Sequence, residues 1–122
     1  MDIVISNQER VLRRVLFLHP TFIKPDGKPS SASYQLKKND DGTLEDGLSV
    51  NIESMTTYED SIEDVTRFRL FASEVNYIRS IGLDCIYNPL PENNAHSLIV
   101  GDIKKPQSRL LAENSIRVNF PD

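Results

Sequence analysis

Residues 67–72 read Arg-Phe-Arg-Leu-Phe-Ala, and the hydrophobic period of this stretch decides the fold class. Phe68, Leu70 and Ala72 fall on one side of an extended chain, and the two arginines fall on the other. A period of two residues is typical of a strand with one buried face. The alternative is a single helix that continues through Ile81. A strand here predicts a chain in which strands and helices interleave, an α+β domain.

Other short alternating stretches predict the remaining strands of the sheet. The clearest runs from Gly47 to Ile52, where apolar and polar residues alternate without a break. The loop of residues 88–95 joins two further candidates as a long hairpin. The other candidate strands are Met1–Ile5, Leu83–Tyr87, Ser97–Val100 and Ile116–Phe120.

The first amphipathic stretch has two interpretations. Apolar residues between Val11 and Leu18 approach the spacing of a buried helical face, and Ser6–Glu9 before them has the spacing of a capping box. We therefore expect a helix that ends before Pro20. The competing interpretation is a strand over Val15–Phe22. Four more helices are predicted. One is short and capped by Ser30 or Ser31, and another is opened by the capping-box candidate Thr56–Glu59, runs to about Val65 or Thr66 and buries Ile62 and Val65. A third covers Glu74–Ile81 with Ser73 as its cap and Gly82 at its end, and the last opens at Lys104 or Lys105 and buries Leu110, Leu111 and Ala112.

Length and composition indicate one ordinary globular domain that covers residues 1–122. Hydrophobic residues make up 39% of the 122 residues and charged residues 26%. Each amphipathic helix needs a sheet face to cover, so we expect a small mixed sheet of about four to five strands with helices packed mainly on one face.

The sequence also predicts the compartment. The longest apolar stretches fall far short of the roughly 20 residues that span a bilayer, so we expect no membrane partner. Asp2 comes early and the basic residues late, the wrong order for a secretory signal. Cys85 is the only cysteine, which fits a reducing compartment. We therefore expect a cytoplasmic protein.

Charge argues against nucleic acid as the main partner. The chain has 14 basic and 18 acidic residues and a net charge of −4. Binding to nucleic acid depends on a concentrated basic surface that neutralises phosphates, and the basic residues here are scattered along the chain.

The two histidines carry the main catalytic hypothesis, a small metal-independent phosphodiesterase or nucleotide-acting enzyme with His19 and His96 as acid and base. His19-Pro20-Thr21 matches, and His96-Ser97-Leu98 partly matches, a His-x-Thr/Ser pattern. The pair resembles the signature of the two-histidine phosphoesterases. That resemblance implies two facing strands, with His19 and His96 as acid and base and with Thr21 and Ser97 as phosphate contacts. Leu98 stands where the second hydroxyl belongs, so Ser97 would point to the opposite face. The alternative is that His96 donates to a backbone carbonyl and His19 lies on the surface.

Other catalytic and metal chemistry finds little support in the sequence. The acidic loop of residues 39–46 fits neither register of a calcium-binding EF-hand loop, and one cysteine with two distant histidines does not make a zinc site. Both common phosphate-binding glycine patterns are missing from the sequence. Cys85 could act as a nucleophile with His96 as its base, but a buried thiol is the default for such a strand. We therefore expect no cofactor and no metal.

The preferred hypothesis is a non-catalytic binding or interaction module, one component of a bacterial cytosolic assembly with another protein as its partner. Long loops on a rigid domain are where recognition residues lie. A further hypothesis is an anion- or nucleotide-binding protein without turnover, in which Arg67 and Arg69 lie beside a pocket and hold an anionic group. The binding surface is expected to include Arg67, Arg69, His96, Asn93 and Asn94.

Overall fold

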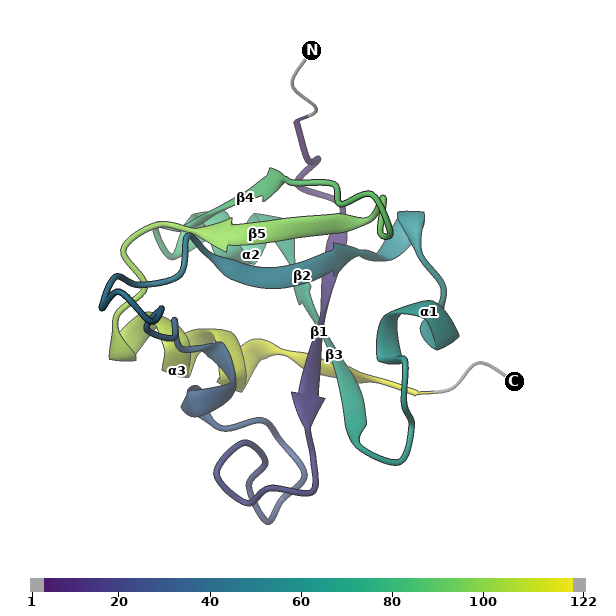
Figure 1. Cartoon of the computed structure of the whole chain (residues 1–122), viewed down its shortest axis with the longest axis vertical. Coiled ribbons are helices and arrows are strands. Elements are labelled where there is room, and N and C mark those ends of the chain that lie inside the picture. Colours follow the sequence, from purple (N-terminus) through teal and green to yellow (C-terminus); the bar gives the residue numbers. More distant parts are fainter. Residues whose placement is uncertain (1–3, 120–122) are drawn as a thin grey trace.

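The computed structural model describes residues 4–119, which form one antiparallel sheet of six strands with short helices around it (Figure 1). The strand order is β4-β5-β2-β1-β3-β6, and every neighbouring pair is antiparallel. The strands are β1 (Arg10–Leu16), β2 (Leu48–Ile52), β3 (Phe68–Glu74), β4 (Asp84–Tyr87), β5 (His96–Val100) and β6 (Ile116–Val118). The α-helices are α1 (Tyr58–Ile62), α2 (Val75–Ser80) and α3 (Lys105–Asn114), with 3-10 turns η1 (Ser31–Tyr34) and η2 (Glu53–Met55).

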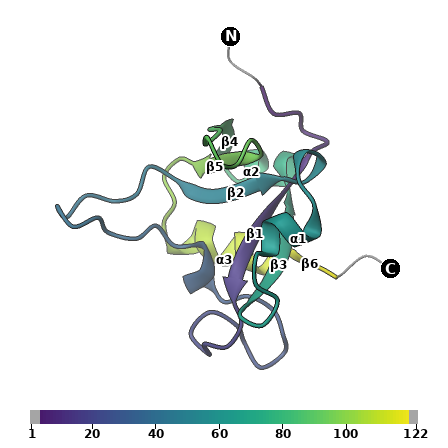
Figure 2. The same ribbon diagram turned by 45° about the vertical axis from the view of Figure 1, so that its right-hand side comes forward.

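The sheet is sharply twisted at its centre. Strands β2 and β5 run across the view of Figure 1, whereas β1 and β3 run down it. Strand β1 pairs with β3 over seven residues, but with β2 only at Val11↔Ile52 and Leu12↔Asn51. The two central strands therefore cross near one end of β1 and separate toward the other end, and Figure 2 shows the same divergence from the side.

Both faces of the sheet are covered. Val11 packs into the larger apolar cluster, which also takes Tyr34 of η1, Ile78 of α2 and Leu111 of α3. Successive residues of a strand point to opposite faces, so the neighbouring Leu12 belongs to a smaller cluster. There Ile62 of α1, which is 1% exposed, covers the other face of the sheet.

The predicted helix over Val11–Leu18 is wrong, because residues 10–16 form strand β1. Both faces of β1 are buried at its centre, so adjacent apolar residues replace the alternation that marks a half-exposed strand. The competing strand over Val15–Phe22 overlaps the end of β1 only. Ser6–Glu9 forms a turn in which the Gln8 amide donates to Ser6 Oγ, and no helix follows it.

The observed sheet is larger than the predicted one. It has six strands in place of four to five, and all of its pairings are antiparallel. Residues 1–3 of the predicted first strand lie outside the described residues, and Val4 and Ile5 are not in a strand. The predicted strands at residues 47–52, 67–72, 83–87, 97–100 and 116–120 are confirmed as β2 to β6 within one or two residues at most bounds. The prediction for Phe120 lies outside the described residues.

The predicted helices that correspond to α1, α2 and α3 are confirmed in place and partly wrong in their bounds, and the short helix predicted after Ser30 or Ser31 is the 3-10 turn η1. The cap of α1 is Thr57 and not Thr56: its side chain accepts from the Asp60 amide, but α1 ends at Ile62 and Val65 is 53% exposed. Strand β3 continues through Ser73, so the cap of α2 is Glu74, and Gly82 follows α2 with φ of 88°. Helix α3 begins at Lys105; it buries Leu111 and Ala112 but leaves Leu110 36% exposed.

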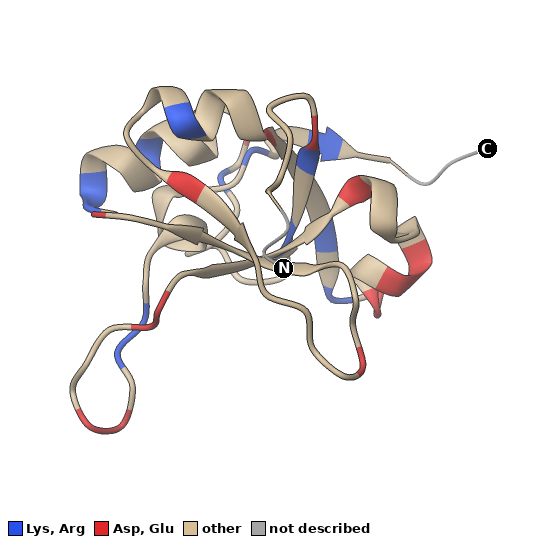
Figure 3. Cartoon of the chain, turned by 90° about the horizontal axis from the view of Figure 1, so that it is seen from above, with Lys and Arg blue, Asp and Glu red and all other residues tan. Residues whose placement is uncertain are grey.

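Charge is unevenly spread over this framework. Figure 3 shows acidic residues at the tip of the long loop before β2 and along α1. Among residues 4–119, every helix is too short or too polar to span a lipid bilayer.

Candidate anion-binding cleft

The two edges of β1 can be told apart from its hydrogen bonds. At one end of the β1–β3 pairing the Phe17 amide donates to the Arg67 carbonyl at 3.1 Å. At the other end the Val75 amide donates to the Glu9 carbonyl at 3.0 Å. In an antiparallel pair, bonded residues alternate with non-bonded ones. The odd-numbered residues of β1 therefore direct their backbone groups to β3. The even-numbered residues, Arg14 and Leu16 among them, direct theirs toward β2.

Strand β2 does not reach this second edge beyond the crossing. The β1–β2 register ends at Leu12↔Asn51, and its continuation would pair Arg14 with Ser49. Instead Nη1 of Arg13 donates to the Ser49 carbonyl at 2.9 Å. The Arg13 side chain thus takes the acceptor that the next rung of the ladder would use. Among residues 4–119, no strand lies next to the backbone edge of β1 from Arg14 to Leu16.

A cleft of about 200 Å³ lies beside this edge. Four consecutive residues of β1, Arg13 to Leu16, line it. Since successive strand residues point to opposite faces, a cleft that touches all four lies at the edge of the strand and not on one face. The rest of its wall comes from the loop after β1, from η1 and its following residues, and from the start of β3. These residues are Phe22, Ala32, Ser33, Lys37, Arg67 and Phe68.

The lining of this cleft is cationic. It contains Arg13, Arg14, Lys37 and Arg67, and within the described part of the chain no acidic residue is in its lining. Two carboxylates lie close to these residues: Oε1 of Glu63 lies 2.6 Å from Nη1 of Arg14 in an exposed pair, and Glu45 accepts from the Lys37 amide at 2.8 Å and attracts the Arg13 guanidinium. Four basic residues thus line one small cleft in a chain whose net charge is −4.

Arg13 is the most constrained of the four. Its Nε donates to the Ser33 carbonyl at 2.5 Å, and its guanidinium carbon lies 5.6 Å from the centre of the Tyr34 ring. Burial lowers the pKa of the Arg13 guanidinium, because the charged form loses hydration there. Its hydrogen bonds to described residues go to the carbonyls of Ser33 and Ser49, and none goes to a carboxylate. A partly dehydrated cation of this kind is stabilised when an anion is brought to it.

Phe68 holds two of the cations in place. The guanidinium carbons of Arg14 and Arg67 lie 5.2 and 5.1 Å from the centre of its ring. A contact with an aromatic ring positions a guanidinium and leaves the N–H donors, which lie in the plane of the guanidinium itself, available for hydrogen bonds. Arg69 is engaged elsewhere, because it stacks on Phe17 at 3.7 Å and donates to two backbone carbonyls. Of the expected arginine pair, Arg67 lines the cleft and Arg69 does not.

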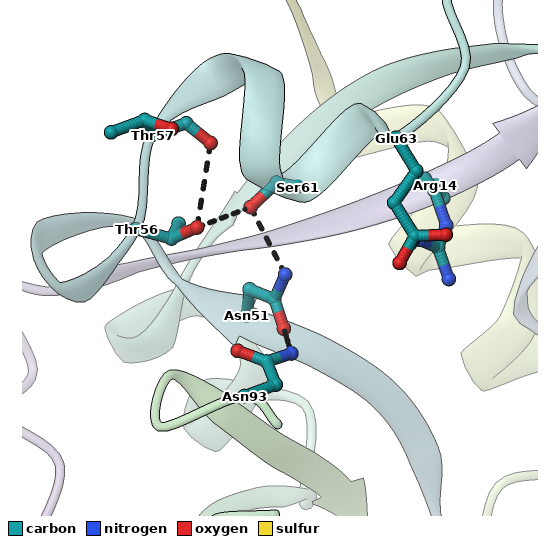
Figure 4. A network of polar contacts seen from close by, with 7 residues as sticks. All are labelled: Arg14, Asn51, Thr56, Thr57, Ser61, Glu63 and Asn93. Atoms are coloured by element: carbon teal, nitrogen blue, oxygen red, sulfur yellow. Dashed lines mark hydrogen bonds and ion pairs between the residues drawn. The ribbon is translucent and has the colours of Figure 1, made fainter.

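A second cleft, of about 450 Å³, adjoins the first and shares Arg13, Arg14 and Phe68 with it. Its far wall is a chain of polar side chains drawn in Figure 4. Asn93 donates to Asn51 Oδ1 at 2.8 Å, and Asn51 donates to Ser61 Oγ at 3.0 Å. This chain ties the loop of residues 88–95 to β2 and α1, so the far wall is built as one unit.

Glu63 closes α1 beside this second cleft with an unusual backbone. Its φ is 61° and its ψ −50°, and the Asp64 amide donates to the Ile62 carbonyl at 2.6 Å across it. This is a γ-turn with positive φ, a strained conformation for a residue with a side chain. The turn directs the Glu63 carboxylate to Arg14 (Figure 4).

The two histidines lie in different regions. His19 is exposed in the loop after β1, where its Nδ1 accepts from the Thr21 amide at 3.2 Å. That loop lies at the opposite end of the molecule from β5, which His96 begins (Figure 1). Nδ1 of His96 lies 2.7 Å from the Asn88 carbonyl, and its Nε2 lies 3.2 Å from Ser49 Oγ. The structure does not bring His19 and His96 together.

The remaining expected site residues divide between clefts and core. Ser97 is fully buried on the core face of β5, whereas His96 lines the larger cleft. The two side chains therefore point to opposite faces of the strand, as expected for adjacent residues. Thr21 lies exposed beside His19. Asn93 belongs to the polar chain, and Asn94 accepts from the Tyr87 hydroxyl at 2.8 Å.

Cys85 is 3% exposed, and burial raises the pKa of its thiol to about 12. A thiol in that state is protonated near neutral pH and is a poor nucleophile. Residues 4–119 contain no group of three or more metal-ligating side chains placed to hold a metal ion.

Comparison with protein-family models, with curated proteins and with solved structures found no match. The candidate site therefore stands on its geometry. Sequence reasoning missed Arg13, Arg14 and Lys37 because it placed the first two on a helix. The available signal was the adjacent pair of arginines between buried residues, which in a strand sends one charge to each face.

Proposed function

We propose that this chain is a non-catalytic binding module that holds an anionic group of its partner, a carboxylate or a phosphate, in the cationic cleft beside β1. The observation that carries the proposal is the set of four cations, Arg13, Arg14, Lys37 and Arg67, around a cleft without an acidic lining residue. The arrangement is specific, because the chain as a whole is acidic.

Arg13 supplies the most directional part of this recognition. A guanidinium has five N–H donors, and the two bonds to carbonyls use two of them, which leaves three. The carbonyls and the Tyr34 ring fix the plane of the group before any ligand arrives. Less side-chain entropy is then lost on binding, and the planar fork suits the paired oxygens of a carboxylate or a phosphate.

This proposal joins two hypotheses drawn from the sequence. An anion-binding protein without turnover was expected to place Arg67 and Arg69 beside a pocket without facing histidines. Arg67 lines the cleft, Arg69 does not, and the separation of His19 from His96 favours this hypothesis over a histidine pair. The partner remains, in this proposal, another protein in a bacterial cytosolic assembly. The anionic group is the part of it that the cleft holds.

Thermal unfolding of the full chain with inorganic phosphate or citrate, at constant ionic strength set by sodium chloride, tests the proposal. A ligand at ten times its Kd stabilises the folded state by about 1.4 kcal/mol. The test variant is the double substitution Lys37→Gln with Arg67→Gln, which removes two exposed cations from the cleft. Arg109→Gln with Arg117→Gln is the matched control, since both arginines are exposed and lie outside the cleft lining.

We expect at least one of the two anions to raise the unfolding temperature of the natural chain and of the control variant. The cleft variant should lose most of that increase. An equal increase in the cleft and control variants, or no increase in the natural chain with either anion, would contradict the proposal.

A further inference from the structure

We infer that the free edge of β1 takes up an extended peptide segment of the partner by strand addition, with an acidic side chain of that segment placed in the cationic cleft. This inference rests on the proposed function, because the carboxylate of the segment is the anion that the cleft holds. It names the ligand class, a short acidic segment in β conformation.

The first support is the direction of the backbone groups. Arg14 and Leu16 direct an N–H and a C=O each away from β3. No strand among the described residues pairs with them on that side, and no described side chain bonds to their backbone. Two such residues, one residue apart, present the repeat that an added strand recognises through main-chain hydrogen bonds.

The second support is the gap across from this edge. The Ile52 amide donates to the Ala95 carbonyl at 2.9 Å, so the even-numbered residues of β2 bond to β5. The backbone N–H and C=O of Ser49 consequently point toward β1, but the carbonyl already accepts a hydrogen bond from Nη1 of Arg13. The gap is thus kept open by a side chain of β1 itself, and β2 is held away from the edge.

The third support is the chemistry of the walls. The smaller cleft is lined by apolar residues as well as by cations; the large apolar ones are Val15, Leu16, Phe22 and Phe68. A free inorganic anion would leave those apolar walls unused. A peptide strand presents side chains to both faces in turn, so an acidic residue and its apolar neighbours can be held together.

The fourth support is the continuation of the space along the strand. The smaller and the larger cleft share Arg13, Arg14 and Phe68 in their linings, and the larger one extends to Asn93 and His96 and is also lined by Glu63 and Glu92. Together they follow β1 from its far end to its crossing with β2. A strand rises about 3.3 Å per residue, so a segment of several residues runs along such a groove whereas a single ion fills only part of it.

Arg14 already shows what the partner's carboxylate would replace. Its ion pair with Glu63 at 2.6 Å joins side chains that are 37% and 64% exposed. Exposed pairs of this kind contribute little to stability, so an incoming carboxylate displaces Glu63 readily. Glu63 then acts as a competitor held within the chain.

The test uses the full chain and the pentapeptide Thr-Val-Glu-Val-Thr-amide with fluorescein coupled to its N-terminal nitrogen through an aminohexanoyl spacer, read out by fluorescence anisotropy. One control peptide carries Gln in place of Glu. Two others carry N-methyl groups, one on both Val amides and the other on the Thr and Glu amides, so that each blocks the hydrogen bonds of one strand edge. A parallel measurement follows backbone amide exchange at Arg14 and Leu16 by NMR, with the peptide and separately with inorganic phosphate.

We expect the Glu peptide to bind at least tenfold more tightly than the Gln peptide, and one of the two N-methylated peptides to lose binding. The peptide should slow amide exchange at Arg14 and Leu16 at least tenfold, whereas phosphate should not. Equal binding by both N-methylated peptides and the parent, or unchanged exchange at both amides, overturns the inference.

The outcomes separate this inference from the proposed function. If phosphate or citrate stabilises the chain through Lys37 and Arg67 but the peptide gives no amide protection, strand addition fails and anion binding stands. If neither the anions nor the peptide binds, both fail. If the two amides become protected without peptide as protein concentration rises, the occupant is a second copy of this chain, and the inference of a separate partner is overturned.

Discussion

Replacing Glu63 by glycine should stabilise the protein relative to replacing it by alanine. Glu63 adopts φ of 61° and ψ of −50° at the end of α1. A non-glycine residue held in a sparsely populated backbone region costs about 1–3 kcal/mol. Glycine removes the Cβ that causes this strain, but it loses roughly 0.5–1 kcal/mol through the greater freedom of the unfolded chain. The balance favours glycine over alanine by about 1 kcal/mol.

Alanine is the correct reference because both variants lose the same ion pair. The Glu63 carboxylate contacts Arg14 in the natural chain, and neither glycine nor alanine can replace that contact. The difference between the two variants therefore isolates the backbone strain. Glu63→Gln provides a second control, since it removes the charge and keeps a side chain of the same length.

Urea unfolding at neutral pH measures the difference. With a slope of roughly 1–3 kcal/mol per molar urea, 1 kcal/mol moves the midpoint by about 0.3–1 M. Glycine should have the higher midpoint at an unchanged slope. If the alanine variant is as stable as the glycine variant or more stable, Glu63 is not strained, and its backbone cannot be what directs its carboxylate to Arg14.

Three further predictions concern the core. Because burial raises the pKa of the Cys85 thiol from 9.0, its value for an exposed thiol, to about 12, its contribution to folding stability is complete below pH 9 and is lost as pH rises from 9 to 12. Iodoacetamide at pH 8 should alkylate Cys85 rapidly only above the urea midpoint, and rapid alkylation of the native protein would refute this. Gly47→Ala would place a Cβ 2.7 Å from the Ile99 carbonyl, so a loss of about 1–3 kcal/mol is expected in urea unfolding, and an unchanged midpoint would contradict it. The Tyr34 hydroxyl is fully buried and makes no hydrogen bond of ordinary geometry to a described residue, although the Ser115 and Ser73 side chains beside it oppose the rise that burial causes in its pKa. Tyr34→Phe should therefore change stability by no more than about 1 kcal/mol in urea unfolding, and a larger loss would count against the reasoning.

Strand β2 could be predicted from the sequence because one of its faces is partly exposed: Ser49 is exposed and Asn51 half-buried between three buried residues. Strand β3 could be predicted from Arg67 and Arg69 at its start, since Leu70 to Ser73 are all buried and both faces are covered there. Strand β1 could not be recognised in this way. It lies at the centre of the sheet, with α3 on one side and α1 on the other, so Val11 and Leu12 are both buried and the period of two disappears.

The candidate site was harder to predict than the fold because it depends on where two strands part. Arg67 could be proposed from its spacing with Arg69, yet only the register shows that Arg67 reaches the cleft and that Arg69 stacks on Phe17. No glycine or asparagine marks the positive φ at Glu63. The local sequence indicates only which backbone conformations a residue prefers. The positive φ of Glu63 and the gap that Arg13 fills between β1 and β2 depend instead on contacts between residues far apart in the sequence.

Arg13 links the shape of the sheet to the charge of the cleft. If the β1–β2 register continued, Arg14 would pair with Ser49 and the edge of β1 would be closed. By donating to the Ser49 carbonyl, Arg13 satisfies that acceptor without closing the edge, so the missing rung leaves no buried carbonyl unpaired on β2. Two groups remain incompletely satisfied in the free chain: the partly dehydrated guanidinium, and the backbone of Arg14 and Leu16. A strand that carries a carboxylate satisfies both at once, whereas an anion alone or a neutral strand satisfies only one. The same arginine that opens the sheet thereby sets which ligand fits it, and binding by the two halves of that ligand should be cooperative.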